Sequence, residues 1–71
     1  MTVTKVLIHW QVRNPDDSGT INTTIVYEDN SEYSTDLFMD SQTAEQLWFS
    51  PLITNWIVSQ ITGSADNYVG A

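Results

Sequence analysis

The chain has 71 residues, no cysteine and a formal net charge of −7, from nine acidic and two basic residues. This length suffices for one small domain, 1–71, and the lack of cysteine excludes disulfide bonds. The acidic balance argues against direct binding to nucleic acid and to anionic membranes, because both need lysine and arginine. No apolar stretch reaches the roughly 18 residues of a membrane-spanning helix.

Residues 2–39 are expected to form a three-stranded antiparallel β-meander. Apolar and polar residues alternate in 2–12, 20–28 and 32–39, which is typical of half-buried strands. Turn-forming residues separate these segments at 14–19 and 29–31. The residues expected on the inner face are Val6, Ile8, Trp10, Val12, Ile21, Thr23, Ile25, Tyr27, Tyr33, Leu37 and Met39.

The strand register follows from matching apolar residues across neighbouring strands. Pairing Val12 with Ile21 keeps the inner faces of the first two strands together. This register sets Lys5 opposite Glu28, and a three-residue second turn then sets Glu28 opposite Glu32. A slip by one residue would expose the whole apolar row, whereas a slip by two residues is also compatible with the sequence.

The second half of the chain predicts helices over about 41–62, followed by a short C-terminal tail at 64–71. Asp40 or Ser41 is a good N-cap for a short helix, and Ser50-Pro51 is a good start for a longer one that ends at Gly63. The predicted fold class is therefore α+β, with one short and one longer helix packed on one face of the sheet. Five residues are expected to be largely buried: Trp10, Ile25, Tyr33, Trp56 and Ile57.

The sequence offers little for catalysis. His9 is the only histidine, lies on the predicted outer face, and has no nucleophile motif around it. The run Asp16–Gly19 lacks the ligand spacing of a calcium loop and is more typical of a turn. We therefore expect no enzymatic activity, no metal site and no cofactor.

Two surfaces are candidates for protein binding. Eight of the nine acidic residues fall in residues 16–45, and a partner-binding acidic face is expected at Glu28, Asp29, Glu32 and Asp36. Residues 46–65 carry no charge, which is typical of interface cores. This second stretch predicts an alternative interface, to a partner or to a second copy of the chain, at Trp48, Phe49, Asn55 and Gln60.

These features lead to two functional hypotheses. The first is a non-enzymatic inhibitor or adaptor that docks its acids on a basic, nucleic-acid-handling protein. The alternative is a structural or decoration subunit of a viral particle or larger assembly, with the uncharged helix as its contact. The size, acidity and lack of cysteine are of the kind found in small phage-encoded proteins, which points to host cytoplasm or the virion. The N-terminal segment has a strand pattern, so we do not expect secretion through a signal peptide.

Overall fold

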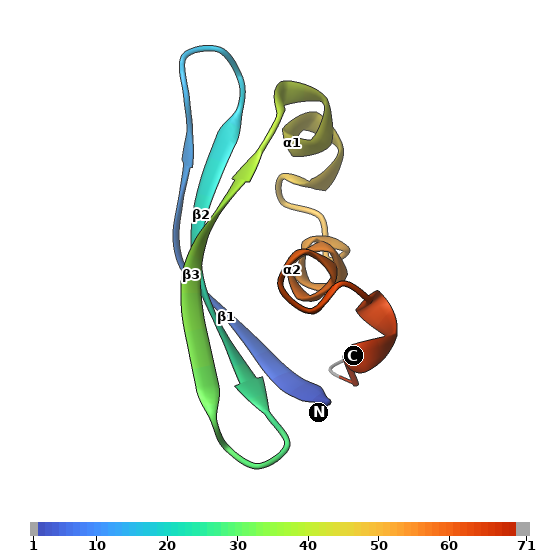
Figure 1. Ribbon diagram of the computed structural model, residues 1–71. Helices are drawn as coiled ribbons and strands as arrows, with labels where there is room; N and C mark the ends of the chain where they lie inside the picture. The colour runs from blue at the N-terminus through green and yellow to red at the C-terminus, as the bar shows by residue number, and fades with distance from the viewer. Residues whose placement is uncertain (1, 70–71) are drawn as a thin grey trace.

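A computed structural model describes residues 2–69 and shows the predicted α+β class, with an open three-stranded antiparallel sheet followed by two α-helices (Figure 1). In chain order the elements are β1 (Val3–Arg13), β2 (Gly19–Tyr27), β3 (Glu32–Met39), α1 (Ser41–Leu47), α2 (Ile53–Thr62) and the short 3-10 helix η1 (Ala65–Asn67). Residues 70 and 71 of the predicted tail lie outside the described residues. No helix within residues 2–69 is long and apolar enough to cross a membrane.

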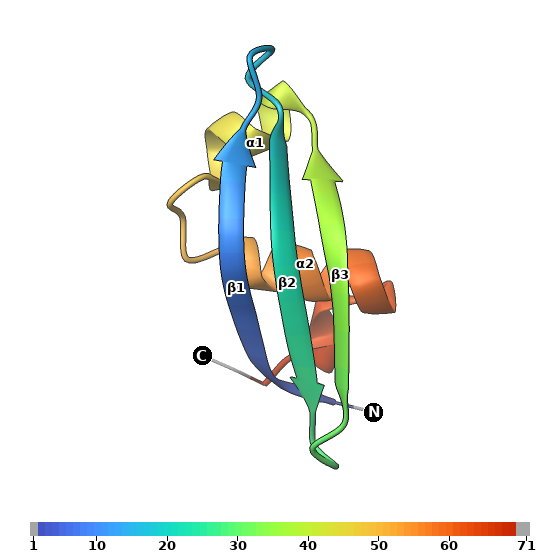
Figure 2. The ribbon, with the colours of Figure 1, turned by 90° about the vertical axis from the view of Figure 1, so that its left-hand side faces the viewer.

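The sheet has the strand order β1-β2-β3 and carries both helices along one face. The opposite face, turned toward the viewer in Figure 2, has no helix over it. We call the first face the helix face and the second the open face. Helix α2 crosses behind the strands, and its C-terminal end extends past β3 (Figure 2).

The two hairpins close with the same type of three-residue loop. The loops are 15–17 and 28–30, and in each the last residue has a left-handed backbone, with φ of 69° at Asp17 and at Asn30. The middle residue is an aspartate whose carboxylate accepts hydrogen bonds from a following serine. Aspartate and asparagine favour such positions, so the sequence chemistry determines the loop type.

The first hairpin differs from the predicted register. Arg13 pairs with Gly19 and Val12 with Thr20, so the predicted pairing of Val12 with Ile21 is wrong. The loop 15–17, closed by a 2.7 Å hydrogen bond from the Asn14 amide to the Ser18 carbonyl, sets this register and places Gly19 on the helix face beneath Trp48. A Cβ atom on Gly19 would lie 2.5 Å from Cζ3 of Trp48, so only glycine fits beneath this ring. With Gly19 and Arg13 on the helix face, Val12 turns to the open face.

A β-bulge at His9 then changes the side on which the residues of β1 lie. Trp10 pairs with Asn22, but Ile8 pairs with Thr23, and His9 is left without a partner residue in the ladder. The one-residue slip therefore exposes Trp10 and Val12, whereas Ile8 returns to the helix face. The slip and the bulge together set Lys5 opposite Val26, so the predicted Lys5–Glu28 pairing is also wrong, and a second irregularity at Thr4 follows toward the N-terminus.

The second hairpin is shifted as well. Its loop is closed by a hydrogen bond from the Tyr27 amide to the Ser31 carbonyl, 2.8 Å long, one residue earlier than predicted. Ile25 therefore pairs with Tyr33, and Val26 with Glu32. The predicted direct opposition of Glu28 and Glu32, with its like-charge repulsion, is wrong.

The hydrophobic core lies between the helix face and the two helices. Its buried members are Val3, Ile21, Ile25, Met39, Ala44, Ile53, Ile57 and Val58. The predicted burial of Ile25 and Ile57 is confirmed, and Trp56 is half-buried against this core. Trp10 and Tyr33 were expected to be buried, but they remain 47% and 50% exposed. Trp10 lies on the wrong face because of the register, and Tyr33 lies at the uncovered end of β3.

The helix ends largely follow the predicted signals. Asp40 caps α1 by accepting a 2.8 Å hydrogen bond from the Thr43 amide, and Gly63 ends α2 with φ of 85°. Ser50 does not cap α2, because a turn over Ser50–Leu52 precedes the helix. After η1, Tyr68 forms an isolated parallel bridge with Val3, which ties the end of the chain to β1.

Candidate functional site

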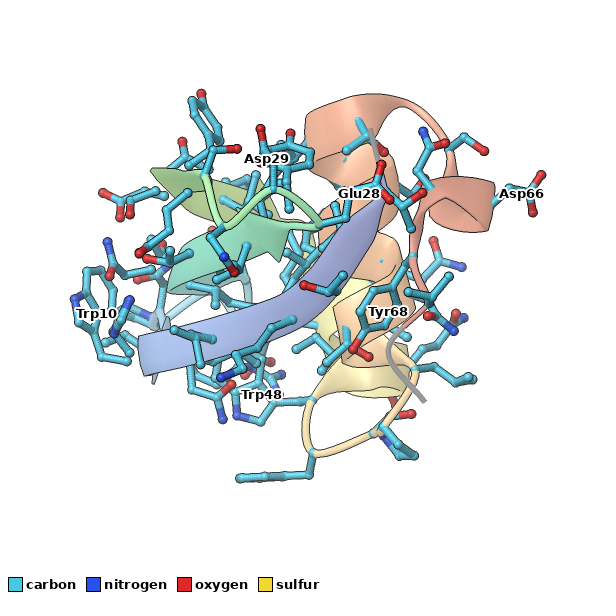
Figure 3. All side chains as sticks on the ribbon, turned by 90° about the horizontal axis from the view of Figure 1, so that it is seen from below. Trp10, Glu28, Asp29, Trp48, Asp66 and Tyr68 are labelled. Carbon is cyan, nitrogen blue, oxygen red and sulfur yellow. The ribbon has the colours of Figure 1, made fainter. Side chains whose placement is uncertain are left out.

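The open face of the sheet presents its side chains in four rows across the three strands. Figure 3 shows Trp10 of β1 pointing away from the helices on this face. From one end to the other the rows are Lys5–Val26–Glu32, Leu7–Thr24–Ser34, Trp10–Asn22–Asp36 and Val12–Thr20–Phe38. These rows determine which side chains a partner on the open face would contact.

Large apolar side chains on the open face remain in contact with solvent. We define the open-face patch as the exposed residues Leu7, Trp10, Val12 and Phe38. Phe38 is 65% exposed, more than the other three members. Exposed groups of apolar and aromatic residues are typical of protein-interaction surfaces. The slip and the bulge in β1 create this patch, because they bring Trp10 and Val12 out of the predicted core.

The polar groups at the centre of the open face bond to one another. Nε2 of His9 lies 2.7 Å from Oγ1 of Thr24, which in turn lies 2.7 Å from Oγ of Ser34. In the next row, the amide of Asn22 donates a 2.7 Å hydrogen bond to the Asp36 carboxylate. His9 is thus an exposed residue that ties the bulge of β1 to β2.

The four predicted acidic residues are divided between two places. Glu32 and Asp36 lie on the open face of β3, with Ser34 between them. Glu28 and Asp29 lie in the loop between β2 and β3, as Figure 3 shows. Asp29 stabilises this loop, because its carboxylate accepts hydrogen bonds from the amide and hydroxyl of Ser31. Glu32 and Asp36 are therefore the acids that share the open face with the patch, Asp36 in the row of Trp10 and Glu32 one row beyond Leu7.

The carboxylates that hold the turns give a pH dependence that checks their role. Hydrogen bonds from Ser31 lower the pKa of Asp29, and hydrogen bonds from Ser18 do the same for the pKa of Asp16. A lowered pKa in the folded state means that the stabilisation is present above the unfolded pKa of about 4 and is lost as the pH falls through the folded value. We expect the melting temperature to decrease as the pH is lowered below about 4. In Asp29→Asn the melting temperature should decrease less steeply with falling pH, because one of these carboxylates is absent. Thermal unfolding at pH 2–7 measures it, and an identical slope in both proteins would contradict the role of Asp29.

The alternative interface is not one continuous surface. Trp48 is half-buried, with its ring over Gly19 and the Arg13 guanidinium 5.3 Å from its centroid. Phe49 points outward, is 86% exposed and has a left-handed backbone with φ of 65°. Asn55 is exposed on α2, and Gln60 lies near the far end of this helix.

A pocket lies between β3 and α2 and was not predicted. Its volume is about 320 Å³, and its lining consists of Tyr27, Tyr33, Thr35, Leu37, Gln60 and Ile61. The alternation in β3 places Tyr33, Thr35 and Leu37 on the helix face, and the end of α2 supplies the opposite wall. The alternation in the sequence predicts which residues of β3 line the pocket, but it does not predict where α2 lies relative to them.

Within residues 2–69, no three histidine or acidic side chains come together in a way that could hold a metal ion. The carboxylate of Asp16, the strongest metal candidate in the sequence, accepts hydrogen bonds from Ser18 instead. Comparisons with protein-family models, with curated proteins and with solved structures gave no match. The features of this chain that could bind a partner are two surfaces: the open face with its two acids, and the pocket beside β3.

Proposed function

We propose that this protein is a small acidic, non-enzymatic binding module that docks on a basic surface of a nucleic-acid-handling protein, as an inhibitor or adaptor. The observation that carries this proposal is the open face of the sheet, which presents exposed apolar residues and also Glu32 and Asp36. A partner that covers this face gains apolar burial at the patch and charge pairing at its border.

The charge distribution supports a basic partner. Both bases lie on β1, and the Arg13 guanidinium is 3.8 Å from Asp17, the one ion pair among the described residues. Lys5 and Glu32 belong to the same row but are separated by Val26. The carboxylates of β3 therefore remain available to lysine and arginine from outside, and they increase the rate of encounter with a positive surface.

A non-enzymatic role agrees with the chemistry of the described residues. The single histidine, His9, is exposed on the open face and forms its hydrogen bond with Thr24. No carboxylate or lysine of the described residues lies among its hydrogen-bond partners. An acid–base mechanism needs such a group beside the histidine and a pocket that orients the substrate. The size and composition are consistent with a phage-encoded protein.

One observation favours the second candidate, a structural or decoration subunit. The connection between α1 and α2 exposes Phe49 and Leu52, the latter to 61%. Two apolar side chains on a protruding turn suit insertion into a neighbouring subunit of an assembly. In that case Phe49→Ser together with Leu52→Ser abolishes assembly, and the acidic residues have no effect on it.

The test of the proposed function compares two double variants that remove the same charge. The partner is first captured from the native host, identified by mass spectrometry and purified. Its affinity is then measured for Glu32→Gln/Asp36→Asn and for the control Glu45→Gln/Asp66→Asn, whose residues are also exposed. We expect roughly tenfold weaker binding at low salt for the first variant, mainly through a slower on-rate, and a small change for the control.

The salt series separates the alternatives. If acids direct the docking, the difference between the two double variants shrinks as ionic strength rises, because exposed charges are screened. Equal affinities for both variants and the unmodified protein at every salt concentration would overturn acidic docking. Equal weakening by both would show that only net charge matters and would overturn docking at this face.

A further inference from the structure

Strand β3 forms an edge of the sheet that has no partner within residues 2–69. In an antiparallel ladder, the backbone groups of every second residue point away from the neighbouring strand. Counting from the bond between the Tyr27 amide and the Ser31 carbonyl, these outward residues are Glu32, Ser34, Asp36 and Phe38. The same four residues have exposed side chains. The edge therefore offers a regular series of N–H and C=O groups outside the ladder, in which the Asp36 carbonyl also accepts a 3.4 Å hydrogen bond from the Thr35 hydroxyl.

The opposite edge of the sheet is protected and β3 is not. Strand β1 has irregularities at Thr4 and His9, and bulges of this kind hinder the addition of a further strand. Its first residue, Val3, is also covered, because its carbonyl accepts a 3.0 Å hydrogen bond from the Val69 amide. The ladder of β3 with β2 is unbroken from Glu32 to Met39 and contains neither proline nor lysine. The two edges thus differ in their readiness to pair.

The two sides of the β3 edge differ in chemistry. On the helix face, the 320 Å³ pocket is lined by Tyr33, Thr35 and Leu37 and closed by Gln60 and Ile61 of α2. On the open face, Glu32 and Asp36 stand four residues apart. Side chains of an added strand alternate between the two faces, so one set would enter the pocket and the other would meet the carboxylates.

Charge decides between a second copy of this chain and a different partner. Two copies joined through β3 would bring two carboxylates from each chain onto one face, and each copy carries a net charge of −7. Like charges on neighbouring strands destabilise their pairing. A strand with lysine or arginine at the matching positions instead gains charge-assisted contacts on that face.

We infer that the edge of β3 binds an extended basic segment of the partner as a fourth strand. This segment has lysine or arginine four residues apart, opposite Glu32 and Asp36, with apolar side chains between them that enter the pocket beside α2. The inference rests on the proposed function and specifies how the basic partner is recognised. Backbone hydrogen bonds to the edge give affinity, and the alternating side chains give specificity.

The probe is a synthetic peptide with blocked ends, Thr-Lys-Val-Thr-Ile-Lys-Thr, whose pattern of basic and apolar residues is the same in both directions. Hydrogen exchange is followed by NMR at the amides of Glu32, Ser34, Asp36 and Phe38. Peptide at ten times its dissociation constant should slow exchange at these amides roughly tenfold, because exchange then requires release of the peptide. The control is the same peptide with its central threonine N-methylated, which removes one strand-forming N–H.

A pair of variants tests the edge from the protein side. Ser34→Pro removes an outward N–H, and Ser34→Ala keeps it, while both lose the hydroxyl contact with Thr24. The N–H lost in Ser34→Pro does not belong to the ladder with β2, so the edge position tolerates proline. We expect the proline variant to bind the peptide at least tenfold more weakly than the alanine variant. If the proline variant does not fold, the N-methylated peptide gives the same comparison on the unmodified protein.

Each outcome decides the inference. Equal binding of the two peptides, or no binding of the lysine peptide, would overturn strand addition, and so would protection of amides outside β3. Protection of the same four amides that rises with protein concentration alone would identify a second copy as the occupant. The proposed function is judged separately: partner affinity that falls in Glu32→Gln/Asp36→Asn but not in Ser34→Pro leaves acidic docking in place without strand addition.

Discussion

Replacing Ile57 with alanine is expected to lower the free energy of unfolding by about 3 kcal/mol. Ile57 is fully buried in α2, within the cluster that contains Ile25 of the sheet. Its truncation removes the transfer free energy of the lost methyl and methylene groups and leaves a cavity between helix and sheet. Small domains of this size often have only about 5 kcal/mol of stability, so about 2 kcal/mol would remain and roughly 3% of the variant should be unfolded at 25 °C.

Urea unfolding followed by tryptophan fluorescence measures this effect. The matched control is Leu52→Ala, which removes a similar side chain that is exposed, and it should change stability by less than about 0.5 kcal/mol. The midpoint of the Ile57 variant should shift without a change in the slope of the transition. A loss below about 1 kcal/mol, equal to that of the control, would show that α2 is not packed against the sheet.

The class of the fold and the order of its elements follow from local sequence signals. Alternation identified the three strands, and Asp40 and Gly63 marked the helix ends that the structure has. These signals act within a few residues, where capping and turn geometry dominate. The start of α2 was predicted too early because Ser50 and Pro51 favour a helix start, yet here they form a preceding turn.

The strand register was not predicted because the turn-forming run 14–19 allows more than one loop, and apolar matching favours a different one. The loop that forms, 15–17, places Arg13 and Gly19 on the helix face, where Trp48 packs over Gly19. Apolar matching alone favours burial of Trp10, which the bulge at His9 prevents. The sequence has no local sign of this bulge, since histidine has no particular preference for it.

The candidate site was predicted in part. Glu32 and Asp36 lie on the open face as expected, because alternation in β3 does not depend on the register. Asp29 lies in the loop as predicted, whereas Glu28 lies there too and not at the end of the second strand. The pocket beside β3 and the open-face patch arise from the placement of α2 and from the slip of β1, which only the tertiary structure reveals.

The second large loss of stability is expected from a substitution at the contact between Gly19 and Trp48. Gly19→Ala is expected to lower the free energy of unfolding by about 2 kcal/mol, because the new methyl group would lie 2.5 Å from Cζ3 of Trp48 and the ring must move. The Arg13 guanidinium lies 5.3 Å from the centroid of this ring, so displacement of the ring also disturbs this cation–π contact. The control is Gly63→Ala, where nothing lies within 4 Å and the cost of about 1 kcal/mol comes from the left-handed backbone alone.

A double-mutant cycle distinguishes steric conflict from a general requirement for glycine at this position. In a Trp48→Leu background the ring is absent, so Gly19→Ala should cost at least about 1 kcal/mol less than in the unmodified protein. Chemical unfolding of the four proteins measures this coupling. Equal costs in both backgrounds would show that Trp48 is not the reason for glycine at position 19. In that case the backbone of the first hairpin alone would require this glycine, and Trp48 would contribute no specific fit to the contact between the residue after α1 and the sheet.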